Sequence, residues 1–355
     1  MSSGAGAGSS AALTPDRPLR IAGALGSPYS LKMRAVLRYR RIPFQWVLRG
    51  SKWDDLPAAP VALIPAISFP DEDGAYLDAM IDSSPQIMRL EELIPDRSIV
   101  PVDPAVAFLD YLLEDYGDEW VTKQMYHYRW WYEDAVAKAG RQLPLDIDQQ
   151  MPAEQLERSR QFITDRQQSR MALVGSTEGN RPVIERSYER LLDLFDAHLA
   201  TIPFLLGERP GRGDFGIFGQ FSQLVGWDPE SARVAVDRAP RVVHWVNSTD
   251  DLSWLPVDGD GGWTDAGSIP ATISDLLCEV GRTYAPFLLA NAAALESGAD
   301  EVVCTIDGRE FRQGPFAYQA KCLRWLRAAH DELDPGSRAA VGRMLADTGC
   351  EQLFA

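Results

Sequence analysis

The chain has 355 residues, of which 45% are hydrophobic and 24% charged, a composition typical of a folded water-soluble protein. At roughly 100–200 residues per domain, this length predicts two or three domains. The 51 acidic and 35 basic side chains give a net charge of -16, which disfavours nucleic acid as a partner. No apolar run approaches the roughly 20 residues that cross a bilayer, so we expect no membrane partner.

The first part of the chain, residues 1–17, consists mostly of Gly, Ala and Ser. It lacks the basic start and the apolar core of a signal peptide, so we expect a disordered tail and a cytoplasmic protein. The four cysteines show no C-x-x-C spacing and predict buried or idle thiols, with a separate redox site as an alternative. They all lie in the last quarter of the chain: Cys278, Cys304, Cys322 and Cys350.

The next part of the chain predicts the order β-α-β-β-β-α. Apolar runs bounded by Gly, Pro and Asp indicate strands, and Pro43 ends the first helix. Asp82-Ser83-Ser84-Pro85 is a strong helix start, because a capping side chain precedes a proline of the first turn. The predicted elements are strand 19–25, helix 30–41, strand 44–48, a hairpin of 64–69 with 76–77, and a helix from 82 through 93.

Helical periodicity dominates the chain from Pro104 onward. The predicted helices are 108–137, 154–173, 182–199 and 215–225, with another around 242–247. Residues 258–262 form the clearest linker. Beyond it we expect a helix through 276–291 that is kinked at Pro286, a hairpin of 302–306 with 309–311, and helices 318–333 and 337–345.

Several short motifs suggest other functions but lack the context that these functions require. Residues 211–216 satisfy G-x-G-x-x-G, yet no strand precedes them as a dinucleotide site requires. The linker has no closing Glu of a calcium loop, because Ile269 stands at that position. The four histidines are isolated, and no G-x-S-x-G indicates a hydrolase. We therefore expect no metal.

Four motifs occur in one order along the chain and are more specific together than singly. They are Gly26-Ser27-Pro28-Tyr29-Ser30 followed by Lys32 and Arg34, Leu63-Ile64-Pro65-Ala66-Ile67, Asp82-Ser83, and 204–210 followed by Asp214-Phe215. Together they resemble serine-type members of the glutathione transferase superfamily. The resemblance covers residues 18–250 and leaves the last hundred residues unexplained.

The resemblance implies a fold that is α/β plus all-α. A thioredoxin-like N-terminal domain would be followed by a helical bundle like that of the glutathione transferases and by a mostly helical C-terminal extension. We divide the chain accordingly. The predicted units are the tail 1–17, the glutathione-binding domain 18–97, the helical domain 104–255 and the extension 264–355.

The resemblance also implies a site for glutathione, a co-substrate that is itself an anion. Ser27 would stabilise the glutathione thiolate, with Tyr29 and Ser30 as substitutes; the alternative is that Ser27 only caps the helix. A cis peptide before Pro65 would present the backbone of Ile64 to a peptide ligand.

The dipeptide Asp82-Ser83 would hold the γ-glutamyl amine and carboxylate of glutathione, or would act as a plain helix cap. The sequence departs from the family pattern because no cysteine precedes Cys278, because Gly211 replaces a Ser or Thr, and because Gln86 replaces an apolar residue.

A cluster of aromatic residues lies in the first long predicted helix. Tyr126, Trp130 and Trp131 cannot all share one helix face. Either they pack on two sides of the helix, or they line an apolar pocket for the second substrate between two domains.

The predicted function is that of a glutathione transferase-like enzyme, in which a glutathione thiolate attacks a small apolar electrophile. Glutathione-dependent isomerisation, ether cleavage and dehalogenation stay open, as does a homodimer. The alternative is a non-catalytic binding or assembly module with the same fold, which the long extension suggests.

Overall fold

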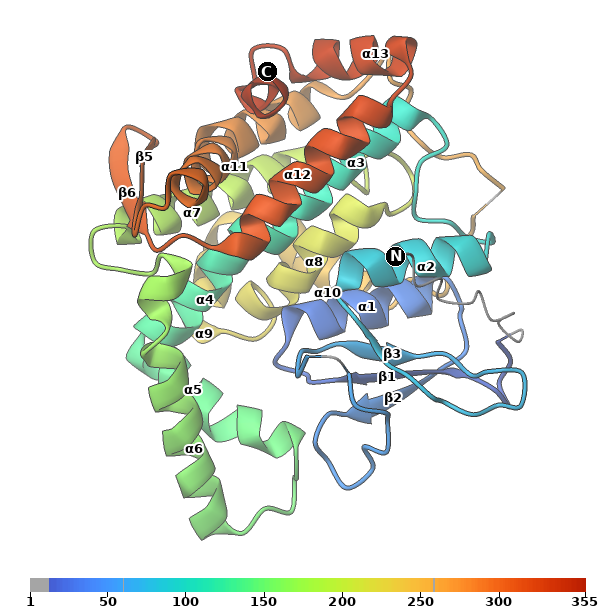
Figure 1. Cartoon of the computed structure of the whole chain (residues 1–355), viewed down its shortest axis with the longest axis vertical. Coiled ribbons are helices and arrows are strands. Elements are labelled where there is room, and N and C mark those ends of the chain that lie inside the picture. The colour runs from blue at the N-terminus through green and yellow to red at the C-terminus, as the bar shows by residue number, and fades with distance from the viewer. Residues whose placement is uncertain (1–12, 60, 258) are drawn as a thin grey trace.

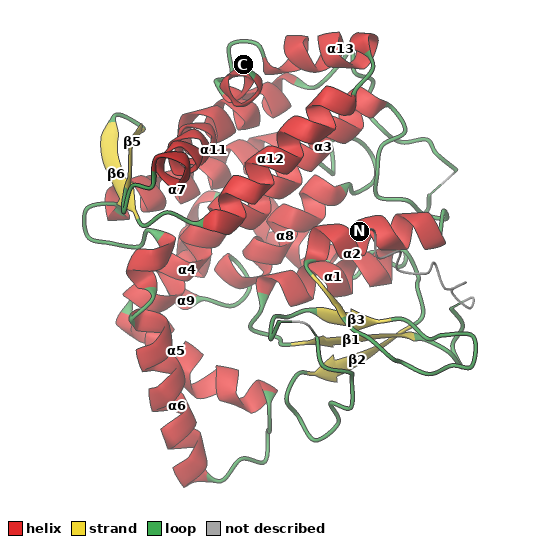
Figure 2. Ribbon diagram, in the orientation of Figure 1, coloured by secondary structure: helices red, strands yellow, loops and turns green. Residues whose placement is uncertain are grey.

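The computed structural model describes residues 13–59, 61–257 and 259–355, and residues 1–12 of the predicted tail lie outside them. A small four-stranded sheet lies at one end of the molecule, and helices make up most of the rest (Figure 2). The sheet order is β2-β1-β3-β4, with β1 parallel to β2 and with β3 antiparallel to both β1 and β4. The strands are β1 (Leu19–Gly23), β2 (Phe44–Leu48), β3 (Ala66–Ser68) and β4 (Met80–Ile81).

Two helices, α1 (Pro28–Tyr39) and α2 (Ser83–Leu93), lie between the sheet and the helical part of the molecule (Figure 1). The structure confirms the predicted β-α-β-β-β-α order and the fold class. The last predicted strand was wrong by four residues, because Met80–Ile81 and not 76–77 pairs with β3.

The helical part begins with α3 (Pro104–Tyr116), whose first turn is capped by the Asp103 side chain. A π-helical turn (Gly117–Val121) joins α3 to α4 (Thr122–Trp131) without a break. The predicted continuous helix 108–137 was wrong at its end, because Tyr132 has an extended backbone and a new helix begins at Glu133. The remaining helices of this part are α5 (Glu133–Gln142), α6 (Ala153–Gln168), α7 (Arg181–Leu199), α8 (Arg212–Leu224), α9 (Pro229–Arg238) and α10 (Pro240–Thr249).

The π-helical turn and α8 approach each other closely through two glycines. A Cβ on Gly117 would lie 2.7 Å from the backbone carbonyl carbon of Gly216, too close for any side chain. The π-helical turn is therefore held against α8.

The last ninety residues pack on the helical part. Helix α11 (Ala271–Ser297) runs unbroken through Pro286 and contacts α7. The predicted hairpin is confirmed as β5 (Val302–Ile306) and β6 (Arg309–Gln313), and it is followed by α12 (Ala317–Glu332) and α13 (Pro335–Leu345). Buried apolar side chains form one continuous core from β1 to the C-terminal turn (Cys350–Phe354).

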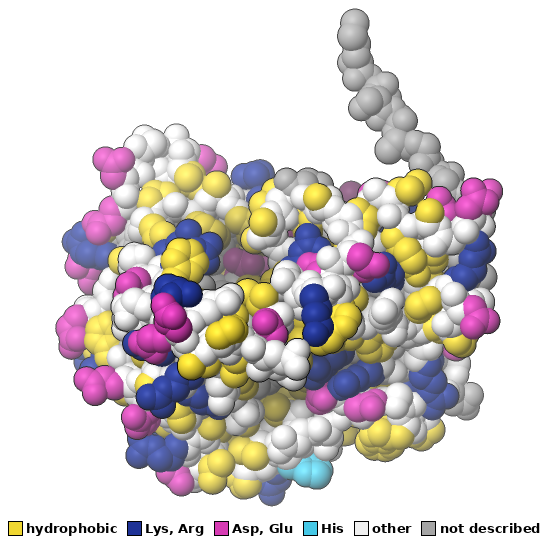
Figure 3. Space-filling model, turned by 90° about the horizontal axis from the view of Figure 1, so that it is seen from below, with side chains coloured by type: hydrophobic (Ala, Val, Ile, Leu, Met, Phe, Trp, Pro, Cys, Tyr) yellow, Lys and Arg dark blue, Asp and Glu magenta, His cyan; other side chains and the backbone are white. Residues whose placement is uncertain are grey.

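The surface in Figure 3 carries Lys and Arg side chains interspersed with Asp and Glu side chains, despite the net charge of -16. Within the described residues, no helix combines the length and the apolar character that a membrane span requires. In the same residues, no group of three or more His, Cys, Asp and Glu side chains is placed to hold a metal ion.

Candidate functional site

A cavity of about 770 Å³ lies where the N-terminal domain, the π-helical turn and the start of α12 meet. The N-terminal domain contributes Tyr29, Leu63, Ile64, Pro65 and residues 81–85. The helical part contributes Tyr111, Asp115, Asp118, Glu119, Thr122, Lys123, Leu173 and Val174. The last part of the chain contributes Gln313, Phe316, Tyr318, Gln319, Lys321, Cys322 and Trp325.

One wall of this cavity presents unpaired backbone groups. Neither the N–H nor the C=O of Ile64 has a hydrogen-bond partner within the described part of the chain. The Ile64–Pro65 peptide bond is cis, as the sequence predicted. Buried backbone groups are almost always paired, so an exposed pair on a cavity wall can accept an extended peptide in strand-like fashion.

The N-terminus of α2 lies on the same wall. The backbone N–H groups of Ser83 and Ser84 have no partner in the described residues, and the positive end of the helix dipole lies there. Asp82, the residue before the helix, has φ 78° and ψ 113°, a rare backbone conformation for a residue other than glycine. Its side chain makes no cap hydrogen bond to the helix. This wall thus offers a carboxylate beside two free N–H donors.

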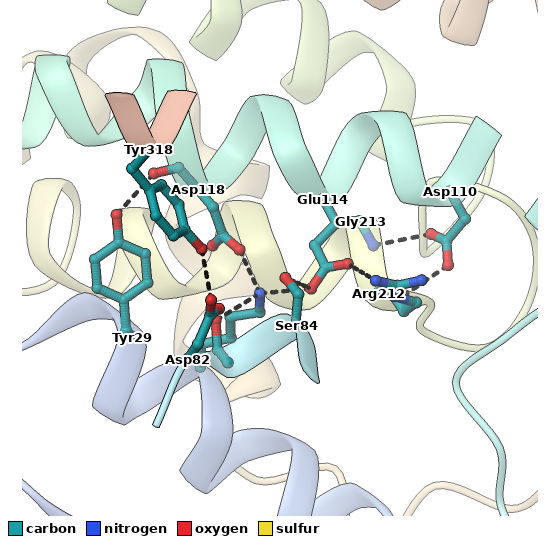
Figure 4. A network of polar contacts seen from close by, with 11 residues as sticks. Tyr29, Asp82, Ser84, Asp110, Glu114, Asp118, Arg212, Gly213 and Tyr318 are labelled. Atoms are coloured by element: carbon teal, nitrogen blue, oxygen red, sulfur yellow. Dashed lines mark hydrogen bonds and ion pairs between the residues drawn. The ribbon is translucent and has the colours of Figure 1, made fainter. Parts of the chain in front are cut away.

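A buried ionic network lies beside this wall (Figure 4). Lys32 of α1 is fully buried, and its Nζ donates to Glu114 Oε1 at 2.7 Å, to Asp118 Oδ2 at 2.5 Å and to Ser83 Oγ at 3.2 Å. Arg212 of α8 forms an ion pair with Glu114 Oε2 at 2.5 Å. Burial raises the pKa of Glu114, but Arg212 and Lys32 outweigh it and hold that pKa below its usual value. The network therefore joins α1, α2, α3, the π-helical turn and α8 through Lys32, Ser83, Glu114, Asp118 and Arg212, respectively. We call it the Lys32 network.

The opposite wall of the cavity carries carboxyl groups with raised pKa values. Burial and the charges of Asp115 and Asp118 raise the pKa of Glu119 to about 8. Burial likewise raises the pKa of Asp115 to about 7, although Tyr284 donates a hydrogen bond to it at 2.6 Å. Near neutral pH each of these two carboxyl groups is therefore partly protonated. The charge of this wall thus depends on pH and on what the cavity holds.

A buried lysine lies beside these acids. Burial lowers the pKa of Lys123 to about 7, and its Nζ donates to the neutral side chain of Gln313 at 2.6 Å. The Nζ also lies 4.2 Å from the centre of the Phe287 ring. No carboxylate oxygen of the described residues lies within ion-pair distance of Lys123, which explains why burial prevails.

Cys322 is the one cysteine on the wall of this cavity within the described residues. Burial and the neighbouring Asp115 and Glu119 raise the pKa of its thiol far above the usual value. The thiol therefore stays protonated and is a poor nucleophile. None of the four cysteines forms a disulfide.

Replacing Glu119 by Gln should stabilise the protein at alkaline pH. The folded state keeps the Glu119 proton up to a pH of about 8, whereas the unfolded state loses it near 4.5. Stability from this group is therefore lost as pH rises through that window, and a neutral Gln avoids the loss. We expect a gain of about 2–4 kcal/mol above pH 8 and little change near pH 4.5, measured by urea unfolding. Glu332→Gln, on the surface, should show no such difference; an equal response of both variants would contradict the burial argument.

The structure brings five of the predicted glutathione-site residues to the cavity: Tyr29, Ile64, Pro65, Asp82 and Ser83. The Tyr29 hydroxyl donates to the backbone carbonyl of Asp118 at 2.8 Å, and burial raises its pKa well above the usual value. Tyr29 therefore lines the cavity with a hydroxyl that is neutral and already hydrogen-bonded.

The structure places Ser27 and Ser30 off the cavity wall. Ser27 is the N-cap of α1, and its Oγ accepts a hydrogen bond from the Ser30 N–H at 3.3 Å. The Ser30 Oγ is buried and accepts from the Ala24 N–H at 3.3 Å. A hydroxyl that accepts one bond still has its own proton to donate, so Ser27, which is half-buried, keeps a free donor at the helix N-terminus.

The structure does not bring the predicted second-substrate residues to this cavity. Tyr126 donates to the Gln167 backbone carbonyl at 2.9 Å, and Trp130 is almost fully buried. The Trp131 ring is tilted against the His127 ring, with ring centres 5.0 Å apart. These contacts match the alternative of a helix packed on two sides. Other aromatic residues, Tyr111, Phe316, Tyr318 and Trp325, line the cavity instead.

Sequence reasoning missed the acids of the π-helical turn and the whole contribution of the extension. The run Asp115 to Glu119 was treated only as part of a long helix, and its three acidic residues carried no sequence signal that they would be buried. Tyr318 and Trp325 lie seven residues apart, which places them on one helix face, but periodicity does not tell what that face contacts.

Comparison with known proteins agrees with the geometry of the N-terminal domain. Residues 22–98 match the family model described as the glutathione S-transferase N-terminal domain. These residues belong to that domain family. The glutathione S-transferase N-terminal domain here includes Ile64, Pro65, Asp82 and Ser83 and ends five residues after α2.

Solved structures of glutathione S-transferases are also similar to the chain. A Tau class enzyme from mango, Mangifera indica, is 18% identical, with 68% of this chain and 93% of that chain covered and a TM-score of 0.39. A family member from Pseudomonas fluorescens with two glutathione bound is 16% identical, with 67% and 89% covered and a TM-score of 0.40. One from Burkholderia graminis is 19% identical, with 65% and 83% covered and a TM-score of 0.37. No curated protein matches the chain.

Proposed function

We propose that the cavity binds glutathione and that the protein activates its thiol for attack on a small apolar electrophile. The observation that carries this proposal is the wall on which the unpaired backbone of Ile64 lies beside Asp82 and the free N–H groups of α2. Glutathione has an ammonium and a carboxylate at its γ-glutamyl end and peptide groups along its middle. Asp82 would accept from the ammonium, the α2 N-terminus would hold the carboxylate, and Ile64 would pair with the peptide.

Ser27 is the residue that we propose as the activator of the thiol. Its free hydroxyl proton and the N-terminus of α1 would both stabilise a thiolate that reaches them from the cavity, and this would lower the thiol pKa. The thiol proton leaves to solvent, and the sulfur electron pair forms the bond to the electrophilic carbon. A leaving group departs with its electron pair, or in an addition the neighbouring atom takes a proton.

Ser27→Ala should raise the pKa of the bound glutathione thiol by about 1–2 units, because one hydrogen bond to a charged sulfur is lost. The measurement is the ultraviolet absorbance of the thiolate as a function of pH. Tyr29→Phe is the matched control, since that hydroxyl already donates to the Asp118 carbonyl. A shift caused by Tyr29→Phe and not by Ser27→Ala would move the activating role from Ser27 to Tyr29.

A second candidate function is a non-catalytic module that binds glutathione without activating it. The observation in its favour is that the Ser27 side chain does not line the cavity. This candidate predicts that bound glutathione keeps the thiol pKa of the free peptide in the wild type and in Ser27→Ala alike.

The reaction subtype, the domain boundaries, the homodimer and the cytoplasmic location stay predictions.

A further inference from the structure

The last part of the chain closes the cavity opposite the glutathione S-transferase N-terminal domain. Helix α12 and the residue before it supply four cavity-lining side chains that carry rings or charge: Phe316, Tyr318, Lys321 and Trp325. None of these residues lies in the segment that matches the family model.

One side chain of this segment reaches the proposed glutathione wall. The Tyr318 hydroxyl donates a hydrogen bond to Asp82 Oδ2 at 2.8 Å, across 236 positions of sequence (Figure 4). Burial and the Asp82 carboxylate raise the pKa of Tyr318 far above the usual value, so the hydroxyl stays protonated and remains a donor.

The contact leaves Asp82 able to bind a second group. A carboxylate has about four acceptor positions on its two oxygens, and Tyr318 uses one of them. The other oxygen, Oδ1, has no hydrogen-bond partner within the described part of the chain. Since the Asp82 side chain does not cap α2, the Tyr318 bond is the contact that holds the carboxylate toward the cavity.

Tyr318 is itself held in place from several directions. The Asn291 side chain of α11 accepts from the Phe316 N–H at 2.8 Å and donates to the Phe316 C=O at 3.0 Å, which fixes the start of α12. The Trp325 ring lies edge-on to the Tyr318 ring at 6.5 Å, and Lys321 Nζ lies 3.9 Å from the centre of the Trp325 ring. Fixed supports of this kind reduce the entropy lost on binding and so favour a defined ligand geometry.

We propose that Tyr318 is a positioning residue that orients Asp82 for the γ-glutamyl ammonium of glutathione, so that the C-terminal extension completes the ligand site. The inference rests on the proposed function, because it assigns the ligand group that Asp82 receives. Tyr318 lies on the Oδ2 side of Asp82, and the ammonium binds on the Oδ1 side.

The test compares two ligands and two variants by isothermal titration of the full chain. The ligands are glutathione and its analogue in which hydrogen replaces the γ-glutamyl amine. Tyr318→Phe should weaken glutathione binding about fivefold to tenfold, because Asp82 loses the donor that fixes it. The same change should leave the affinity for the analogue within about twofold, since that ligand has no ammonium to contact Asp82.

Tyr126→Phe is the matched control. It removes a hydroxyl of similar burial that donates only to Gln167, away from the cavity, and it should change neither affinity. In a background of Asp82→Ala, Tyr318→Phe should have no further effect on glutathione, which isolates the pair. The comparison of Asp82→Ala with the Asp82→Ala/Tyr318→Phe double variant supplies the result even if Tyr318→Phe alone lowers stability.

Three results would overturn the proposal. Equal weakening of both ligands by Tyr318→Phe would show a purely structural role. Tighter glutathione binding by Tyr318→Phe would show that Tyr318 competes with the ligand for Asp82. Unchanged affinity for both ligands would show no role, while the proposed function would stand. Failure of the wild type to bind either ligand would instead remove the proposed function, and this inference with it.

Discussion

Lys32→Met lowers the free energy of unfolding by about 3–5 kcal/mol, the range expected when one partner of a buried ion pair is removed. The Lys32 side chain is fully buried, and its Nζ contacts both Glu114 and Asp118. Met fills a similar volume, so the loss arises from charge and not from a cavity. Arg212 still pairs with Glu114, and the uncompensated charge therefore falls on Asp118.

This assignment of the uncompensated charge predicts a specific rescue. Lys32→Met combined with Asp118→Asn should recover most of the lost stability, since the remaining Glu114–Arg212 pair is balanced. Lys52→Met, at an exposed position, is the control and should stay within about 0.5 kcal/mol of the wild type. Urea unfolding followed by circular dichroism measures all three variants. A Lys32→Met variant as stable as Lys52→Met would contradict the structural role of the network.

Phe287→Ala should destabilise the protein by about 3–5 kcal/mol, the usual cost of a large cavity in a core. Phe287 is fully buried in α11, and its ring lies 6.0 Å from Trp120 of the π-helical turn and 5.9 Å from Phe311 of β6. The side chain therefore joins the extension to the helical part and to the turn that carries Asp118 and Glu119.

The control for this prediction is Phe162→Ala, because that side chain is 69% exposed and should change stability little. Thermal unfolding of Phe287→Ala should remain a single transition at lower temperature, since one continuous core spans both parts. Two separate transitions, with one unchanged from the wild type, would contradict a shared core.

Local signals were enough to predict the N-terminal domain from the sequence. Ser27 and Pro28 start α1, Pro65 precedes β3, and Asp82 precedes α2, each within a few residues of the predicted boundary. The second predicted hairpin strand was displaced because pairing with β3, and not side-chain type, determines where β4 forms.

The helical part was harder to divide correctly. The helix break at Tyr132 has no Pro or Gly beside it, and only the acidic pair Glu133 and Asp134 at the start of α5 signals a new helix. Helix α9 was missed although Asp228-Pro229 is an ordinary helix start. The break was missed because the apolar periodicity continues where the helix ends. Helix α9 was missed because the periodicity weakens where the chain is still helical.

The site could be predicted only in part, because its two halves lie far apart in the sequence. Motifs identified Ile64, Asp82 and Ser83, which share one wall. The acids of the π-helical turn and the Tyr318 contact depend on tertiary packing between α3, α11 and α12, for which one sequence carries no local signal. The aromatic cluster around Trp130 was informative about packing and not about ligand binding.

The most direct test of the central claim is isothermal titration of the wild-type chain with glutathione. The proposal predicts saturable binding of one glutathione per chain at millimolar ligand or below, with a weaker but still measurable affinity in Asp82→Ala. Absence of binding heat at millimolar glutathione, or binding that Asp82→Ala leaves unchanged, would contradict the assignment of this cavity as the glutathione site.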